Sequence, residues 1–461
     1  MGRPTLKSFF ALISLSALGL TACLSEEDIV SISSSGSSGP SIEFKYNYQL
    51  LKYLYIHQDE YLEAPEKYIG KLDLYSLSNY QIPLEYYDIY YMYAKMNDDY
   101  TYYLDPSRSS KAIYSLKYSD QRLDPGFEWD KTDSTNQYIV TSVITNSPAY
   151  KAGLKEGDII TAIEGVAPTS DVVFERLSLA TEGDTINYTI QRDSSSKNIS
   201  LILEPYLSPT VKLSFEDSIP VIKILDFVPT TSSDSGTYGE FMAFMRQTEK
   251  YKSLIVDLRD NGGGDGDQCF AISQEFLSRG DSTMGFISTR GDTIQNIQVF
   301  DTTFYINDVD GIAKDRYVVF LANGFSASCS EVLLGSVVQN TKSPIVGNIT
   351  YGKGIGQFYR STPSYGLARI TASRIIDKDF KTYHKYGFNP DFFIVDDNVA
   401  LKKAVELAKE GSYVRQAGYG TSNTGHFAKS AEVKDTMPGF YMLPSDLKKH
   451  SFVKGISKNA P

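Results

Sequence analysis

Short apolar runs that alternate with helical segments between residues 209 and 410 constrain the fold of this 461-residue chain most strongly. The apolar runs predict strands over 221–227, 253–258 and 316–322, and the segments between them predict helices near 239–251, after Gly264 and over 329–340. Buried strands that alternate with helices are typical of a sheet layered with helices. Residues 206–410 are therefore expected to form an α/β core.

The rest of the chain predicts further domains. Residues 43–110 have helical patterning with breaks at Pro65 and Pro83, which indicates a small helical domain. Residues 111–205 carry short alternating segments separated by Gly, Pro and Asp turns, which indicates a β-rich domain. The last segment, 411–461, has no usable period and is expected to be a C-terminal extension. The whole is a multidomain α/β chain.

The first 22 residues have the pattern of an export signal. Arg3 and Lys7 give a positive start, and the apolar stretch 9–20 is too short to span a bilayer comfortably. Leu20-Thr21-Ala22-Cys23 resembles the lipobox of bacterial lipoproteins, which implies a lipid on Cys23. The alternative is ordinary signal cleavage beside an incidental cysteine.

The segment after Cys23 suggests where such an anchor would be found. Ser25-Glu26-Glu27-Asp28 resembles the acidic export tag of Bacteroidetes lipoproteins, although a solvated acidic start to a linker explains it equally well. Ser and Gly dominate 31–41, so residues 23–42 are expected to be a flexible tether. The resemblance implies a location in the cell envelope, anchored to the outer membrane and displayed at the surface.

The charge of the chain argues against one class of partner. Its formal net charge is −11 and its pI is about 5.0, with no cluster of Lys and Arg. Nucleic acids bind to basic surfaces, so no nucleic-acid partner is expected. The sequence does not indicate an oligomeric state.

Ser328 lies where the predicted strand 316–322 turns into the predicted helix. A serine at such a turn is exposed, and the free N–H groups of the helix start can stabilise an oxyanion. These features are typical of a nucleophile. The structural alternative is a capping box, in which Ser328 and Glu331 only begin the helix.

Lys353 lies between Gly352 and Gly354 in a largely uncharged segment. Burial disfavours the ammonium form of lysine, so a lysine placed here is a candidate general base near neutral pH. A lysine in a surface turn is the alternative. Separately, the strand 253–258 runs into the glycine-rich turn 260–264, which offers unencumbered backbone N–H groups. It lacks the Lys and Ser/Thr of a phosphate-binding loop.

Part of the β-rich region resembles the PDZ domains of bacterial proteases. The resemblance rests on Ser147-Pro148-Ala149 and on the stretch from Ala152 to Gly165, which includes Gly157-Asp158. PDZ domains bind a peptide as an added strand and hold its terminal carboxylate with loop N–H groups. The loop expected here is Pro125-Gly126-Phe127-Glu128, because Gly126 lets the backbone approach a ligand, so Gly126 and Phe127 are the candidate contacts. A glycine before an aromatic residue also commonly begins a strand.

Taken together, the three segments around Ser328, Lys353 and the glycine-rich turn resemble the C-terminal-processing, or tail-specific, serine peptidases. The resemblance implies Ser328 as nucleophile, Lys353 as base and Gln357 as the residue that orients the lysine. It also implies an oxyanion hole, formed by N–H groups of Gly263 (or its neighbour Gly262) and Cys329, and a core of the ClpP/crotonase-like type. No metal or cofactor is implied, and no His lies in a motif that would support a Ser/His/Asp triad.

The chain departs from the family pattern at two places. Cys329 replaces the usual alanine after the nucleophile, and Asn348-Ile349-Thr350 replaces a more usual Glu-Pro-Thr before the base, which leaves the rigidity of that loop open. Cys329 and Cys269 are expected to be two small buried thiols, with a bond between them as the alternative.

Besides a partner-docking scaffold that works through the PDZ-like domain alone, two kinds of function remain open from the sequence. The family resemblance favours an endopeptidase whose substrates are proteins or peptides held by their C-terminal tails. The rival is a surface lipoprotein on the same fold that binds a peptide or an apolar ligand without cleaving it. The rival gives no reason for Ser328, Lys353 and Gln357 to be present together.

Overall fold

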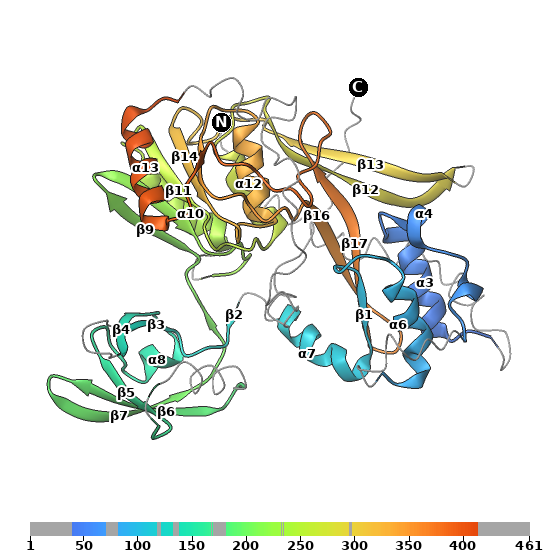
Figure 1. The fold of residues 1–461 in the computed structure, drawn as a ribbon, viewed down its shortest axis with the longest axis horizontal. Helices are drawn as coiled ribbons and strands as arrows, with labels where there is room; N and C mark the ends of the chain where they lie inside the picture. The colour runs from blue at the N-terminus through green and yellow to red at the C-terminus, as the bar shows by residue number, and fades with distance from the viewer. Residues whose placement is uncertain are drawn as a thin grey trace, which may run out of the picture. The chain divides into compact units, whose positions relative to one another are not determined.

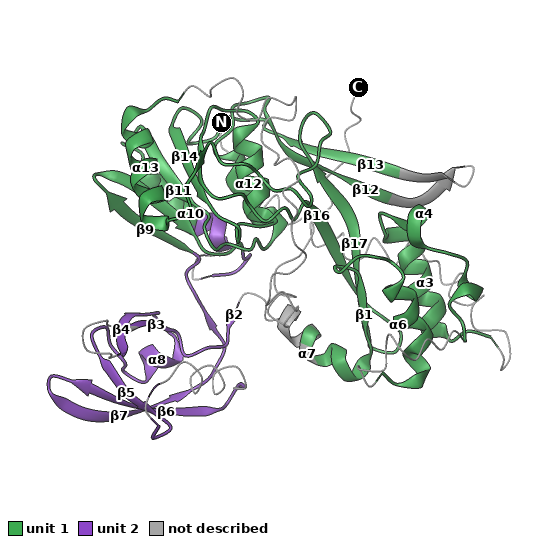
Figure 2. Ribbon diagram, viewed as in Figure 1, with its two compact units in different colours: residues 1–117, 211–227, 241–461 green, residues 118–210, 228–240 purple. Residues whose placement is uncertain are grey.

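The computed structural model describes residues 39–70, 82–117, 121–131, 138–166, 168, 181–231, 233, 235–294 and 297–413. These residues form two compact units, coloured green and purple in Figure 2. The expected signal segment, Cys23, the acidic segment 25–28, most of the tether and residues 414–461 lie outside the described residues. Among the helices of the described ranges, none is both long and apolar enough to cross a bilayer.

The first unit is built on a six-stranded sheet. Its strand order is β18-β15-β14-β11-β10-β9, and all neighbours are parallel except the antiparallel pair β10 and β9. The bounds are β9 Val211–Glu216, β10 Ile219–Ile224, β11 Ser253–Asp257, β14 Tyr317–Ala322, β15 Ile345–Gly347 and β18 Phe392–Phe393. The apolar runs predicted as strands in this region are therefore strands of one sheet.

Helices cover both faces of this sheet (Figure 1). The four helices are α10 Gly236–Gln247, α11 Gly266–Gln274, α12 Cys329–Val338 and α13 Asp397–Glu410. On one face, Val319 and Leu321 of β14 pack in a core with α13. Phe320 points to the other face, where its ring contacts Phe276 just beyond α11. Alternate residues of a strand face opposite sides, so one apolar run supplies both cores.

A second, antiparallel sheet lies in the same unit. Its order is β1-β17-β12-β13, and β16 also pairs with β17. The bounds are β1 Tyr102–Leu104, β12 Ser282–Ile294, β13 Ile297–Ile306, β16 Ile355–Ser361 and β17 Leu367–Ile376. Strand β17 is buried at nearly every residue. It pairs with β16, which follows Lys353, and with β1, which lies in the N-terminal region.

The N-terminal helices pack against this second sheet. They are α3 Ile42–Leu54, α4 Gln58–Tyr61, α6 Tyr87–Ala94 and α7 Pro106–Lys117, with short 3₁₀ turns at Pro65–Lys67 and Leu84–Tyr86. Buried residues of α3 and α6 share one core with Tyr103 of β1 and with Ala368 and Ile370 of β17. The helical region thus belongs to the same compact unit as the α/β layer, and helix α7 runs past the boundary expected at residue 110.

The second unit contains a five-stranded antiparallel sheet in the order β3-β4-β5-β6-β7. Its elements are β2 Gln121–Arg122, β3 Phe127–Lys131, β4 Tyr138–Val143, α8 Pro148–Lys151, β5 Ile159–Ile163, β6 Thr185–Arg192, β7 Ser195–Ile202 and β8 Tyr206–Leu207. The turn before β5 is fixed by the buried Asp158, which accepts a hydrogen bond from the Lys155 N–H at 2.8 Å and pairs with the Arg192 guanidinium at 2.6 Å.

Candidate active site

Ser328 occupies a constrained turn between β14 and α12. Its φ is +56° and its ψ is −115°, a region that side-chain-bearing residues rarely adopt. The turn is held by its neighbours: the Ser326 hydroxyl donates to the Leu258 carbonyl at 2.8 Å, and the Ser330 hydroxyl donates to the Asn261 carbonyl at 2.8 Å. Backbone strain of this kind persists only where the surroundings impose it, and it presents the Ser328 side chain at the start of α12.

The carboxylate of Glu331 joins Ser328 to the loop that carries Lys353. It is fully buried and accepts hydrogen bonds from the N–H groups of Ser328, Gly352 and Lys353, at 3.0, 2.7 and 2.8 Å. The Thr350 hydroxyl donates to it at 2.6 Å. Burial raises the pKa of Glu331 to about 7, against the opposing effect of these four donors. The capping interaction expected from the sequence is therefore one part of a larger clamp.

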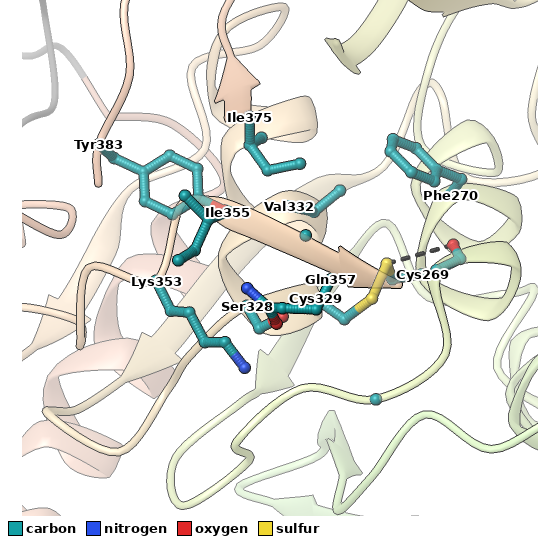
Figure 3. Close-up of a pocket in the computed structure, with 13 residues that line it drawn as sticks. Cys269, Phe270, Ser328, Cys329, Val332, Lys353, Ile355, Gln357, Ile375 and Tyr383 are labelled. Carbon is teal, nitrogen blue, oxygen red and sulfur yellow. Dashed lines mark hydrogen bonds between the residues drawn. A yellow bond between two sulfur atoms is a disulfide. The ribbon is translucent and has the colours of Figure 1, made fainter. Parts of the chain in front are cut away.

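Lys353 lies in the loop between β15 and β16, and its side chain is 7% exposed. It lines one pocket together with Ser328 and Gln357 (Figure 3). The structure thus brings together the three residues that the sequence predicts for catalysis. The Asn348-Ile349-Thr350 segment is held in place, because Asn348 N–H donates to the Ala322 carbonyl at 3.0 Å and Thr350 N–H to the Phe388 carbonyl at 3.2 Å.

Gln357 is fully buried in β16. Its Oε1 atom accepts a hydrogen bond from Nη2 of Arg369 at 3.1 Å, and its Nε2 atom has no hydrogen-bond partner among the described residues. Arg369, on β17, is itself 1% exposed. Arg369 could not be identified from the sequence, because an arginine within an apolar strand does not show which side chain it contacts.

The glycine-rich turn after β11 lies against Ser328. Gly263 has a φ of +107°, and a Cβ atom there would lie 2.7 Å from the Cβ atom of Ser328 and 3.0 Å from the backbone nitrogen of Cys329. The Gly263 N–H donates to Oδ1 of Asn261 at 2.9 Å. Gly262 is the preceding, half-buried residue of the same turn. The structure therefore places the predicted oxyanion residues side by side, with one of their N–H groups engaged by a side chain of the turn.

Cys269 and Cys329 form a disulfide, which corrects the expectation of two free buried thiols. Their Cα atoms are 5.6 Å apart, within the range that a disulfide requires. The bond joins α11 to the first residue of α12, immediately after Ser328. The sequence could not favour this pairing, because 60 residues separate the cysteines and nothing local indicates that these two helix starts meet.

The pocket beside Ser328 is mainly apolar. Apart from the disulfide, its larger lining side chains are Phe270, Val332, Ile355, Ile375 and Tyr383 (Figure 3). Within the described residues, no group of three or more His, Cys, Asp or Glu side chains could hold a metal ion.

Loss of the disulfide is expected to destabilise the first unit. A bridge across 60 residues restricts the unfolded chain, so Cys269→Ala should lower the free energy of unfolding by roughly 2–4 kcal/mol. Urea unfolding without reductant measures the difference. In the presence of a reductant the wild type and the variant should converge. Equal stabilities without reductant would show that the bridge contributes nothing.

The two residues proposed for peptide binding lie in the second unit. Gly126 has a φ of +78°, and a Cβ atom there would lie 2.1 Å from the Cβ atom of Ser147. Phe127 is the first residue of β3, and its ring contacts Trp129 and Tyr188. Close packing is thus one reason for a glycine at this position, and peptide binding there stays a prediction.

Comparison with known families decides the classification. Residues 218–394 match the model of peptidase family S41, and residues 126–203 match that of the PDZ domain. The chain therefore contains an S41 peptidase domain and a PDZ domain. The S41 match includes Ser328, Lys353, Gln357 and the glycine-rich turn, and the PDZ match covers most of the second unit.

Two relatives resemble this chain over most of its length. It is 27% identical over 347 residues to a protein of Staphylococcus haemolyticus described as a CtpA-like serine protease, covering 73% of this chain and 66% of the relative. It is 26% identical over 301 residues to the carboxy-terminal-processing protease of Bartonella bacilliformis, covering 64% and 66%. The matches thus span just under two thirds of the relatives' length.

A solved structure supports the fold of this chain. A protein from Bacteroides fragilis assigned to the S41 proteases superposes with a TM-score of 0.52 at 13% identity, covering 82% of this chain and 100% of the other. The multidomain α/β architecture expected from the sequence, with a PDZ domain and a peptidase core, is confirmed.

Proposed function

We propose that this chain is a serine endopeptidase in which Ser328 is the nucleophile and Lys353 the general base. The neutral amine of Lys353 takes the proton of Ser328 as the hydroxyl oxygen attacks a peptide carbonyl carbon. The carbon–nitrogen bond then breaks, and the proton passes to the leaving amine. Water hydrolyses the resulting acyl-enzyme, which releases the new carboxyl end and restores the serine.

One observation carries this proposal: Ser328 and the buried Lys353 line one pocket, and Glu331 holds both backbones at once. A binding protein needs no such fixed relation between a strained serine and a buried lysine. The family match gives the same reaction class, since S41 is a family of peptidases.

The oxyanion of the reaction would be stabilised by the Cys329 N–H at the start of α12 and by the glycine-rich turn. In this proposal the Gly263 N–H leaves Oδ1 of Asn261 when substrate binds, or the neighbouring Gly262 N–H serves instead. Either donor lies in the turn that touches the nucleophile. The role assigned to Gln357 is to orient the amine of Lys353 from within the same pocket.

The substrates we propose are proteins or peptides with a free C-terminal tail that the PDZ domain binds. The PDZ match and the name of the Bartonella relative, a carboxy-terminal-processing protease, support this assignment. Gly126 and Phe127 are the proposed contacts for the carboxylate.

We further propose that Cys23 carries a lipid that anchors the protein in the outer membrane. The support is the lipobox-like sequence and the tether that follows it. A Cys23→Ser variant should then move from the membrane fraction to the soluble fraction of cells. Unchanged fractionation would contradict the anchor.

The test of the reaction is cleavage of an unfolded protein with an apolar C-terminus by the chain that lacks residues 1–23. Ser328→Ala and Lys353→Ala are each expected to lower kcat/KM by more than about 10³-fold, because each removes one half of the nucleophilic machinery. Lys342→Ala, which removes an exposed lysine of the same unit, is the matched control and should cleave like the wild type. Equal activity of all four proteins, or inactivity of all four in the absence and presence of reductant, contradicts the proposal.

A further inference from the structure

The ring of Tyr100 lies beside the amine of Lys353, although the two residues are far apart in the chain. The Nζ atom of Lys353 is 5.3 Å from the centroid of the ring. The Tyr100 hydroxyl and the Tyr351 hydroxyl share a hydrogen bond of 3.3 Å. Tyr100 therefore contacts the side chain of the base and also the loop that carries it.

The segment that carries Tyr100 is firmly held. Asp98 accepts hydrogen bonds from the Tyr100 N–H at 2.9 Å and from the Thr101 hydroxyl at 2.6 Å. The oxygen of that hydroxyl in turn accepts from the Thr371 N–H of β17 at 2.9 Å. This turn leads directly into β1, which pairs with β17. The backbone that carries the Tyr100 ring is thus held by Asp98 and by β17, without any contribution from Lys353 to these hydrogen bonds.

The guanidinium of Arg369 also lies close to the Tyr100 ring. The guanidinium of Arg369 lies 5.9 Å from the Tyr100 ring centroid, and 5.6 and 5.5 Å from those of Tyr102 and Tyr359. Arg369 and Lys353 are both buried, and once Lys353 has taken the proton of Ser328 both are cations, which is costly unless their surroundings compensate the charge. The electron-rich face of an aromatic ring supplies such compensation.

We propose that Tyr100 is a positioning residue for the general base: its ring covers the amine of Lys353 and holds it toward Ser328, and its hydroxyl anchors the loop through Tyr351. This assignment rests on the proposed peptidase function for its catalytic consequence. By this assignment the N-terminal region, whose helices pack on the second sheet, also contributes a residue to the proposed active site. The ring restricts both the position of the amine and its access to water.

The kinetic test compares Tyr100→Leu, which removes the ring, with Tyr100→Phe, which keeps it. Misplacing a catalytic group by about 1 Å can cost about a hundredfold, so Tyr100→Leu should lower kcat by at least about tenfold while KM changes less than about twofold. Tyr100→Phe should stay within about threefold of the wild-type kcat, because it keeps the ring beside the amine. It loses only the hydrogen bond to the Tyr351 hydroxyl, which at 3.3 Å is longer than usual and therefore weak. An unchanged kcat in Tyr100→Leu, a loss confined to KM, or equal losses in both variants overturns the assignment.

A second readout does not require peptidase activity. Acetylation of individual lysines by an N-hydroxysuccinimide ester at about pH 9.5, followed by peptide mass spectrometry, reports how accessible each amine is. Lys353 should react at least about fivefold faster in Tyr100→Leu than in the wild type or in Tyr100→Phe, since only the leucine variant removes the cover. Lys342 is the internal reference in every sample. Equal reaction rates of Lys353 in the wild type and in Tyr100→Leu overturn the proposal.

Tyr359→Leu is the matched control for the aromatic surroundings. It removes another ring that lies near Arg369, so it separates an effect on Arg369 from cover of Lys353. Acetylation of Lys353 should be unchanged in this variant, and an increase equal to that of Tyr100→Leu contradicts a specific role for Tyr100. If the wild type proves inactive while Lys353 is protected by Tyr100, the peptidase proposal fails and the structural assignment stands.

Discussion

Glu331→Leu is expected to destabilise the first unit by more than about 4 kcal/mol. Leucine matches the size of the side chain but leaves the four donors of Ser328, Thr350, Gly352 and Lys353 buried without an acceptor. Each buried donor that loses its partner costs about 1–3 kcal/mol. Urea unfolding of the variant and the wild type measures the loss. A difference below about 1 kcal/mol would contradict the role of Glu331 as a clamp.

Glu331→Gln is the matched control, because it keeps one oxygen acceptor and removes the titration. The pKa of Glu331 is raised from 4.5 to about 7, so between these values the folded state holds a proton that the unfolded state has released. The contribution of this group to stability is therefore greatest below pH 4.5 and is lost as the pH rises to about 7. The free energy of unfolding should fall less steeply with pH across this window in Glu331→Gln. Equal slopes in both proteins would show that Glu331 does not titrate there.

Gly263→Ala is expected to lower kcat/KM by more than about a hundredfold. The added Cβ atom would lie 2.7 Å from the Cβ atom of Ser328 and 2.9 Å from the Ala327 carbonyl oxygen, closer than such atoms approach one another. Either the nucleophile or the glycine-rich turn must move, and both form the proposed oxyanion site. Steady-state kinetics on the substrate used for Ser328→Ala measures the effect.

The control for Gly263→Ala is Gly280→Ala. Gly280 also has a positive φ, of +95°, but a Cβ atom there meets nothing within 4 Å. This variant carries the same kind of backbone strain without the collision, so it should lose some stability and keep its activity. Similar losses of activity in both variants would trace the effect to strain alone.

The sequence predicts the α/β core well because its strands are continuous apolar runs bounded by turns. The runs expected at 253–258 and 316–322 became β11 and β14 almost to the residue. The antiparallel sheet of β12, β13, β16 and β17 was not predicted, since β12 and β13 mix polar and apolar residues and give no clear period. The helical pattern of residues 43–110 was visible, but nothing in it indicates the strand on which these helices pack.

In the candidate site, too, the sequence predicts what is local along the chain and misses contacts between separate segments. Ser328, Lys353 and Gln357 could be named from short motifs whose neighbours lie close in sequence. Tyr100 and the Cys269–Cys329 bond could not, because each acts through a contact between segments that are distant along the chain. Arg369 could not either, because its contact with Tyr100 is also distant and nothing local shows that its side chain reaches Gln357. The bond of the Gly263 N–H to Asn261 is local, but only the backbone geometry of the turn reveals it.

Strand β17 also determines when this site can exist during synthesis. Both β1, which follows Tyr100, and β16, which carries Gln357, take their hydrogen-bond partners from residues 367–376. A nascent chain that has not reached Leu367 has no strand on which to align either segment. The contacts between β1 and β17, whose residues are far apart in the sequence, are also expected to form late. The proposed nucleophile and base therefore stay unassembled in the growing polypeptide until β17 has been made.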